Sequence, residues 1–123
     1  MILLDTSVWA DHLRRREDRV FALLDEGQVV MHPFVLGELA LGHLAPREDI
    51  VADLHALPTI HIAEPEEVLL LIERQELIGV GISYIDVHLL AAAASTEGCL
   101  LWTRDKRLGR AATRLGVAAE PIH

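Results

Sequence analysis

Short apolar runs alternate with stretches of helical spacing along the whole chain. The runs MILL at 1–4, VVMH at 29–32, TIHIA at 59–63 and CLLWT at 99–103 have the length of strands, and a last short run lies near Val117. Both faces of these runs are apolar, which is typical of strands in a parallel sheet that is covered on both sides. We therefore predict five parallel strands.

Between these runs, apolar residues recur every three or four positions, as on the buried face of a helix. The pattern predicts helices from Thr6, over 17–25, 34–44, 48–57 and 84–97, from Pro65 to near Gly79, and a basic helix ending at Leu115. Strands that alternate with helices predict an α/β fold. We expect a three-layer α/β/α arrangement with a five-stranded parallel sheet, formed by residues 1–123 as a single domain.

Composition narrows the class of protein. A chain of 123 residues with 51% hydrophobic residues is long enough to bury a core as one domain. The single cysteine, Cys99, lies in an apolar run and has neither a disulfide partner nor a zinc motif, which favours a reducing compartment. The sequence has no apolar stretch of membrane-spanning length and no signal-peptide pattern, so we expect a cytoplasmic protein without a membrane partner.

The charges are segregated along the chain. The net charge is −8, yet nine of the eleven basic residues lie in two segments, 14–19 and 104–114, whereas thirteen acidic residues lie between 20 and 103. A basic run is often only a solvated helix face. Two runs that meet beside one site would instead provide a surface for phosphates.

Two aspartates follow predicted strands directly. Asp5 ends the run MILLD, and Asp105 follows LWTR, each at the start of a predicted helix. Either residue could simply cap its helix. The carboxyl ends of parallel strands, however, meet at one edge of a sheet, which is where open α/β folds bind ligands. The repetition of the arrangement favours a shared site.

Two further acidic residues fall on apolar helix faces. Glu38 is spaced three or four residues from Phe34, Val35 and Leu41, and Asp86 is similarly spaced from Leu89 and Leu90. The spacing predicts that both carboxylates point inward, where an unpaired charge is costly. Few basic residues lie nearby in the sequence to neutralise them. We therefore expect Asp5, Glu38, Asp86 and Asp105 to converge on a divalent cation, with Mg²⁺ or Mn²⁺ favoured by an all-carboxylate set.

These four acidic segments resemble those of PIN-domain ribonucleases. The segments are DTSVW at 5–9, FVLGEL around Glu38, SYIDVHLLAAA around Asp86 and the TRD that ends in Asp105. They occur in order over the whole chain, and the compact length is similar to that of VapC toxins of toxin–antitoxin modules. The resemblance implies a five-stranded parallel fold and metal-dependent hydrolysis of RNA phosphodiesters.

The resemblance also implies roles for particular residues. Asp5, Asp86 and Asp105 would be the main Mg²⁺ or Mn²⁺ ligands, and Glu38 would be a ligand or would position the attacking water. The hydroxyl residues beside them would orient the carboxylates: Thr6, Ser7 and Thr103. The candidates for contacts with RNA phosphates are Arg14, Arg15, Arg107 and Arg110.

The family's toxins commonly form homodimers and are neutralised by a small antitoxin protein. The predicted helix over 64–78 contains the run VLLLI, which is more apolar surface than one helix face can bury against a sheet. We therefore expect a homodimer and an antitoxin-binding groove, with these residues buried in one or both.

Two other classes remain open at this stage. A phospho-accepting receiver domain is also an α/β unit of similar length, in which Lys106 would bind the phosphate, but it leaves Glu38 and Asp86 without a role. A catalytically silent PIN-like domain that binds proteins would not need all four acidic residues.

Overall fold

Three parallel strands form the centre of the computed structural model, which describes residues 1–119. Strand β1 (Ile2–Leu4) lies between β2 (Val29–Val30) and β3 (Leu100–Trp102), so the sheet order is β2-β1-β3. In the register of β1 and β3, Leu4 is paired with Trp102. The two strands therefore end side by side, directly before Asp5 and Thr103.

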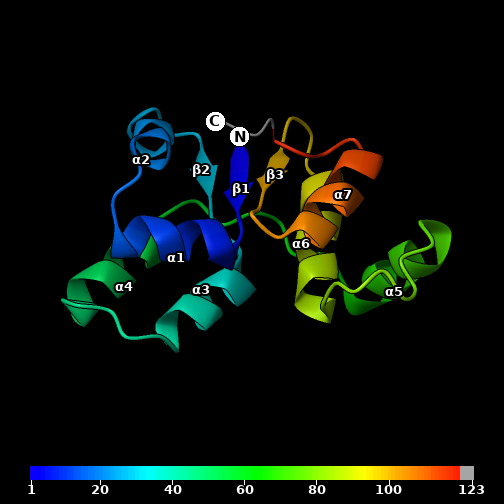
Figure 1. Ribbon diagram of the computed structural model, residues 1–123, viewed down its shortest axis with the longest axis horizontal. Coiled ribbons are helices and arrows are strands. Elements are labelled where there is room, and N and C mark those ends of the chain that lie inside the picture. The colour runs from blue at the N-terminus through cyan, green and yellow to red at the C-terminus, as the bar shows by residue number, and fades with distance from the viewer. Residues whose placement is uncertain (120–123) are drawn as a thin grey trace.

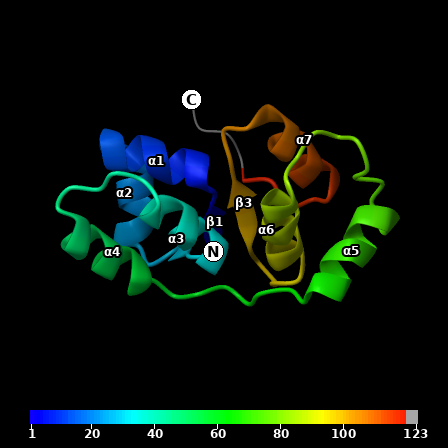
Figure 2. The ribbon, with the colours of Figure 1, turned by 90° about the horizontal axis from the view of Figure 1, so that it is seen from below.

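Helices lie on both sides of these strands (Figures 1 and 2). On one side are α1 (Thr6–Arg14), α2 (Asp18–Asp25), α3 (Pro33–Ala40) and α4 (Arg47–His55). On the other side are α5 (Pro65–Arg74), α6 (Tyr84–Ala94) and α7 (Lys106–Arg114). The predicted α/β class and the parallel arrangement of the strands are confirmed.

The prediction of five strands is wrong for the described residues. The run TIHIA forms only a single parallel bridge, between Thr59 and Met31, and the last run forms only a bridge between Ala118 and Leu101. Of the residues 59–63, only Ile60 and Ala63 are buried, so the segment lacks the two buried faces of a central strand. Both segments occupy edge positions of the sheet without extending into strands.

Three predicted helices end at least three residues early. Helix α6 ends at Ala94 rather than at Glu97, and the other two end early for local reasons. Helix α5 ends at Arg74 rather than near Gly79 because Glu76 adopts a left-handed conformation, with φ of 53°. Helix α3 ends at Ala40 rather than at Leu44. The guanidinium of Arg47 donates hydrogen bonds to the carbonyl oxygens of Ala40 and Gly42, at 2.5 and 3.1 Å, and so satisfies the end of the helix.

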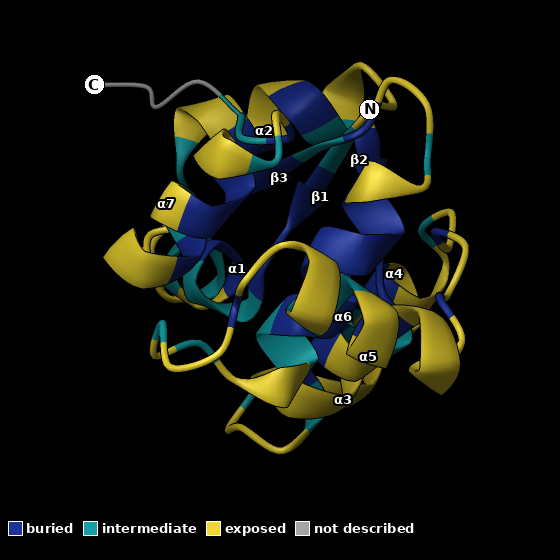
Figure 3. Ribbon diagram, turned by 90° about the vertical axis from the view of Figure 1, so that its right-hand side faces the viewer, coloured by how far each residue is buried: buried dark blue, intermediate teal, exposed yellow. Residues whose placement is uncertain are grey.

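The core is densest around α6. Seven consecutive residues of this helix, from Val87 to Ala93, are buried, and small alanines allow it to pack closely on β3, α5 and α7. Figure 3 shows this burial along α6 and the strands, whereas much of α5 is exposed. No helix within residues 1–119 is long and apolar enough to cross a membrane.

His32 is a buried polar residue at the end of β2. Its Nδ1 accepts a hydrogen bond from the Phe34 N–H at 3.0 Å and caps α3, whereas its Nε2 has no partner within the described residues. Burial, together with the nearby His88, lowers the pKa of His32 from 6.5 to about 4. The folded protein therefore keeps this imidazole neutral at pH values where the unfolded chain would protonate it.

This difference predicts a pH-dependent stability. Between pH 6.5 and about 4 the unfolded state binds a proton at His32 that the folded state does not, so stability should fall as the pH decreases through this range. The variant His32→Asn keeps a capping side chain but does not titrate. In urea denaturation at several pH values, its free energy of unfolding should depend less steeply on pH than that of the wild type. Parallel curves for the two proteins would contradict the assignment to His32.

Candidate active site

Asp5 lies at the carboxyl end of β1 and is almost fully buried, with 5% of its surface exposed. The Thr103 hydroxyl at the end of β3 donates a hydrogen bond to its Oδ2. Its Oδ1 accepts hydrogen bonds from the Ser7 hydroxyl at 2.5 Å and from the Val8 N–H at 3.2 Å, which caps α1. Asp5 is therefore both a helix cap and a buried carboxylate at the sheet edge, so the two interpretations of this residue are compatible.

Asp105 is connected to Asp5 through Thr103. The Asp105 N–H donates to Thr103 Oγ1 at 3.0 Å, while the same hydroxyl donates to Asp5. Asp105 Oδ1 accepts hydrogen bonds from the N–H groups of Arg107 and Leu108, at 2.8 and 3.0 Å, and caps α7. One threonine hydroxyl thus links the two carboxylate residues that follow neighbouring strands.

Asp86 lies in the first turn of α6 and is half-buried. It forms a capping box with Ser83: its Oδ2 accepts from the Ser83 N–H at 3.2 Å, and its own N–H donates to Ser83 Oγ at 3.1 Å. Burial raises the pKa of the Asp86 carboxyl, hydrogen bonds from Ser83 oppose this shift, and the charges of Asp5 and Asp105 add to it. Asp5, Asp86 and Asp105 therefore lie within electrostatic reach of one another.

Glu38 does not point inward as predicted. It is exposed, because the buried stripe of α3 consists of Val35 and Leu39, and Glu38 lies beside that stripe. Its Oε1 accepts a hydrogen bond from the Thr6 hydroxyl at 2.7 Å, which connects α3 to α1. Thr6 therefore orients Glu38, whereas Ser7 and Thr103 orient Asp5.

The chemistry of these donors fits a hard divalent cation. All four are carboxylates, and a bound cation relieves repulsion of the kind that, after burial, adds to the raised pKa of Asp86. Within residues 1–119, however, no three His, Cys, Asp or Glu side chains stand close enough together to hold an ion. Convergence of the four carboxylates on a metal stays a prediction.

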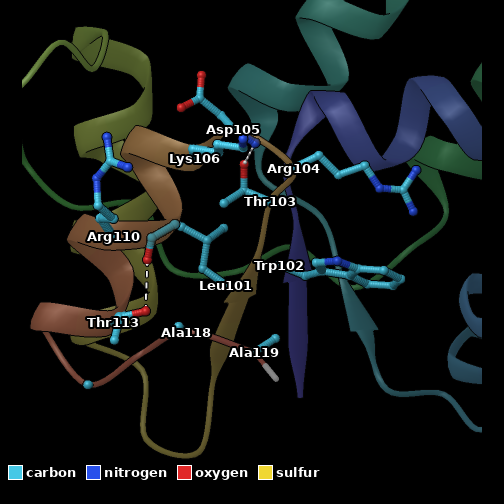
Figure 4. A pocket seen from close by; sticks show the side chains of 12 residues that line it. Leu101, Trp102, Thr103, Arg104, Asp105, Lys106, Arg110, Thr113, Ala118 and Ala119 are labelled. Atoms are coloured by element: carbon cyan, nitrogen blue, oxygen red, sulfur yellow. Dashed lines mark hydrogen bonds between the residues drawn. The ribbon is translucent and has the colours of Figure 1, made fainter. Parts of the chain in front are cut away.

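An open cleft of about 810 Å³ borders this site on the side of β3 and α7. Figure 4 shows it extending from Thr113 and Ala118 to Thr103 and Asp105, with Lys106 and Arg110 among the side chains that line it. Of the four candidate acidic residues, only Asp105 lines this cleft. A phosphodiester backbone in this cleft would therefore contact Lys106 and Arg110 beside Asp105.

Comparison with known proteins identifies the family. Residues 2–114 match the family model described as the PIN domain. The chain belongs to the PIN-domain family. It is also 43% identical over 121 residues to proteins named Ribonuclease VapC32 from two strains of Mycobacterium tuberculosis, CDC 1551 / Oshkosh and ATCC 25618 / H37Rv, and the match covers 96% of this chain and 95% of each relative. The resemblance to VapC-type PIN domains is confirmed, and the receiver-domain alternative is wrong.

Sequence reasoning missed the role of Arg104 in this PIN domain. Its guanidinium donates to the Asp11 carboxylate and to both oxygens of Glu17, so it joins the loop after β3 to α1 and to the start of α2. The Arg104 N–H also donates to Ser7 Oγ at 3.1 Å, and Ser7 in turn donates to Asp5. The hydrogen bonds from Arg104, together with its positive charge, lower the pKa of both Asp11 and Glu17. These partners lie about ninety residues away in the sequence, and no local pattern indicates the pairing.

The four arginines predicted to bind phosphate are not equivalent. Arg14 pairs with Asp11 at 2.5 Å, although its side chain stays largely exposed, and Arg15 is exposed at the end of α1. Arg107 lies against the backbone of Gly81: a Cβ at that position would come within 2.8 Å of its guanidinium. Arg110 lines the cleft beside Asp105 (Figure 4).

The bridging hydroxyl of Thr103 predicts a measurable effect on stability. The variant Thr103→Val keeps the shape of the side chain but leaves a buried oxygen of Asp5 without its partner, which should lower the free energy of unfolding by about 1–3 kcal/mol. The control is Thr113→Val, whose hydroxyl donates at 2.9 Å to the Gly109 carbonyl on the exposed surface of α7. Urea denaturation in the presence of a chelator should show a clearly larger loss for Thr103→Val. Equal losses in the two variants would contradict this role.

Proposed function

We propose that this PIN domain is a metal-dependent endoribonuclease and the toxin of a toxin–antitoxin pair. The observation that carries the proposal is the similarity to relatives named as ribonucleases over nearly the whole chain. The arrangement of carboxylates at the ends of β1 and β3 supports it. The cytoplasmic location and the single-domain organisation predicted from the sequence are parts of the same proposal.

Asp5, Asp86 and Asp105 would hold Mg²⁺ or Mn²⁺, with Glu38 as a fourth ligand or as the residue that positions water. A bound divalent cation polarises the phosphoryl oxygen, lowers the pKa of water and stabilises the leaving oxygen. Ser7 and Thr103 hold the Asp5 carboxylate in one orientation through their hydroxyl groups. Thr6 does the same for Glu38.

Partner proteins are part of the proposal as well. Leu69 and Leu70 on α5 are exposed, as is Ile78 after it, and this apolar surface supports a homodimer. A groove of about 380 Å³ between α1, α3 and the start of α4 has Thr6 and Glu38 among its lining residues and apolar side chains such as Leu13, Leu39 and Ile50. An amphipathic segment of a small antitoxin would fit such a lining and would cover Glu38.

The variant Asp86→Asn tests both the metal site and the activity. Without metal, the neutral amide removes the repulsion from Asp5 and Asp105, so the variant should melt at the same temperature as the wild type or higher. With Mg²⁺ or Mn²⁺, the wild type should gain more stability than the variant, because only the wild type keeps the full ligand set. Cleavage of total RNA should fall by orders of magnitude in the variant.

The control for this experiment is Asp53→Asn on the exposed surface of α4, which should change neither property. Retained cleavage by Asp86→Asn would contradict the assigned role of that carboxylate. Absence of RNA cleavage by the wild type with either metal would contradict the proposed activity and favour the silent protein-binding domain.

The arginines are tested through salt dependence. Replacing Arg107 and Arg110 together by Gln, or Arg14 and Arg15 together, should weaken RNA binding and reduce the salt slope by about one for each phosphate that the variant no longer neutralises. The control is Arg19→Gln, an exposed residue on α2. Binding should be measured at several salt concentrations with chelator present to prevent cleavage. Unchanged slopes in both double variants would show that these arginines form only solvated helix faces.

A further inference from the structure

Two exposed aromatic side chains lie on the helices that carry Glu38 and Asp86. The chain has five aromatic residues of the Phe, Trp and Tyr type. Trp9 and Trp102 are buried, and the ring of Phe21 on α2 is covered by the Arg16 guanidinium at 3.9 Å. Phe34 and Tyr84 are 38% and 49% exposed. In the part of the chain that the structure describes, Phe34 and Tyr84 are therefore the two aromatic rings that are neither buried in the core nor covered by a cation.

The two rings are held together by one histidine. His88 lies 4.9 Å from Phe34 and 4.7 Å from Tyr84 between ring centroids, with interplanar angles of 73° and 88°. These contacts are edge-to-face, and His32 lies 4.9 Å from Phe34 with its ring tilted by 60°, so no parallel aromatic stack covers Phe34 or Tyr84 within the described residues. His88 itself is only 3% exposed, and its Nδ1 has no hydrogen-bond partner there. The cluster thus joins α3 to α6 and contains an unpaired buried nitrogen.

The cluster lies next to the candidate carboxylates. Phe34 precedes Glu38 by one helical turn in α3, and Tyr84 precedes Asp86 by two residues in the first turn of α6. Figures 1 and 2 show the first turns of these helices on either side of the ends of the strands. The loop that leads into Tyr84 contains Gly81, against which the Arg107 guanidinium lies. Aromatic faces, a cation and carboxylates therefore come from neighbouring segments of the chain.

We propose that Phe34 and Tyr84 form a stacking subsite for an unpaired nucleobase of the RNA substrate. This proposal rests on the ribonuclease function proposed above. A nucleobase has a flat π face that can stack on the exposed rings, and its edge carries hydrogen-bond donors and acceptors. The phosphate attached to the same nucleotide matches the positive charge of Arg107. An aliphatic protein segment would use only the apolar part of this surface. The subsite would hold a base beside the bond that the carboxylates address.

The proposal predicts that the affinity for single-stranded RNA falls when an aromatic ring is removed from Phe34 or Tyr84. Replacing Phe34 or Tyr84 by Leu should weaken binding of single-stranded RNA by about fivefold to a hundredfold and raise KM more than it lowers kcat. Tyr84→Phe keeps the ring and should bind nearly as the wild type does. The control is Phe21→Leu, which removes an aromatic side chain of similar exposure, 46%, from α2.

The direct probe is a single-stranded RNA oligonucleotide that contains 2-aminopurine, whose fluorescence is quenched on stacking. Binding is measured with chelator present, and cleavage of the same oligonucleotide with Mn²⁺. Quenching should occur with the wild type, Tyr84→Phe and Phe21→Leu, and should be lost with Phe34→Leu and Tyr84→Leu. Circular dichroism of every variant identifies any that fails to fold. Comparing Tyr84→Phe with Tyr84→Leu then shows whether binding requires the aromatic ring or only an apolar side chain at this position.

The outcomes separate this subsite from the proposed function. If the wild type cleaves the oligonucleotide but the Leu variants retain quenching and KM, the stacking subsite is overturned and the nuclease is not. If the wild type neither binds nor cleaves RNA, both proposals fail. If the Leu variants lose binding of a small protein partner while RNA binding is unchanged, the surface is a protein-docking site and the subsite is overturned.

Discussion

The burial of the Asp5 carboxylate constrains the rest of the site. A charge with 5% exposure must be satisfied by hydrogen bonds, and its partners come from two separate parts of the chain: α1 and the end of β3. The parallel register that pairs Leu4 with Trp102 brings these parts together. A slip between β1 and β3 would remove the Thr103 hydroxyl from Asp5 and would also move Asp105. The geometry around Asp5 therefore depends directly on the correct pairing of β1 and β3.

The acidic residues near Asp5 differ in how their charges are neutralised. The loop after β3 is fixed by Arg104, which pairs with Asp11 and Glu17 and so neutralises charges next to α1. Among residues 1–119, only the hydroxyl and amide of Ser83 oppose the burial of Asp86 and the repulsion from Asp5 and Asp105. The charge of Asp86 at the candidate site is thus not neutralised by a basic side chain of the described residues, whereas the charges of Asp11 and Glu17 beside the site are. Such a distribution suits a site that gains stability by binding a cation.

The parts of this picture that depend on local spacing could be predicted from the sequence. Alternating runs of apolar residues indicated the α/β class, and Asp5 and Asp105 were placed at strand ends. Glu38 was misplaced because its spacing from Phe34 and Leu41 mimics a buried stripe, yet Phe34 and Leu41 are themselves exposed. The run TIHIA has the composition of a strand, but only a bridge at Thr59 forms. The partners of Arg104 depend on tertiary contacts that no local pattern contains.

Capping explains why the candidate site residues are ambiguous in the sequence. Asp5, Asp86 and Asp105 each accept hydrogen bonds from backbone N–H groups at the start of a helix, so each would be favoured there without any catalytic role. The helix starts nevertheless determine where Asp5 and Asp105 lie, because α1 and α7 begin directly after the neighbouring strands β1 and β3. A cap uses part of a carboxylate's accepting capacity, and Asp105 Oδ1 alone accepts from the N–H groups of Arg107 and Leu108. The same hydrogen bonds that start each helix therefore also fix the orientation of its carboxylate.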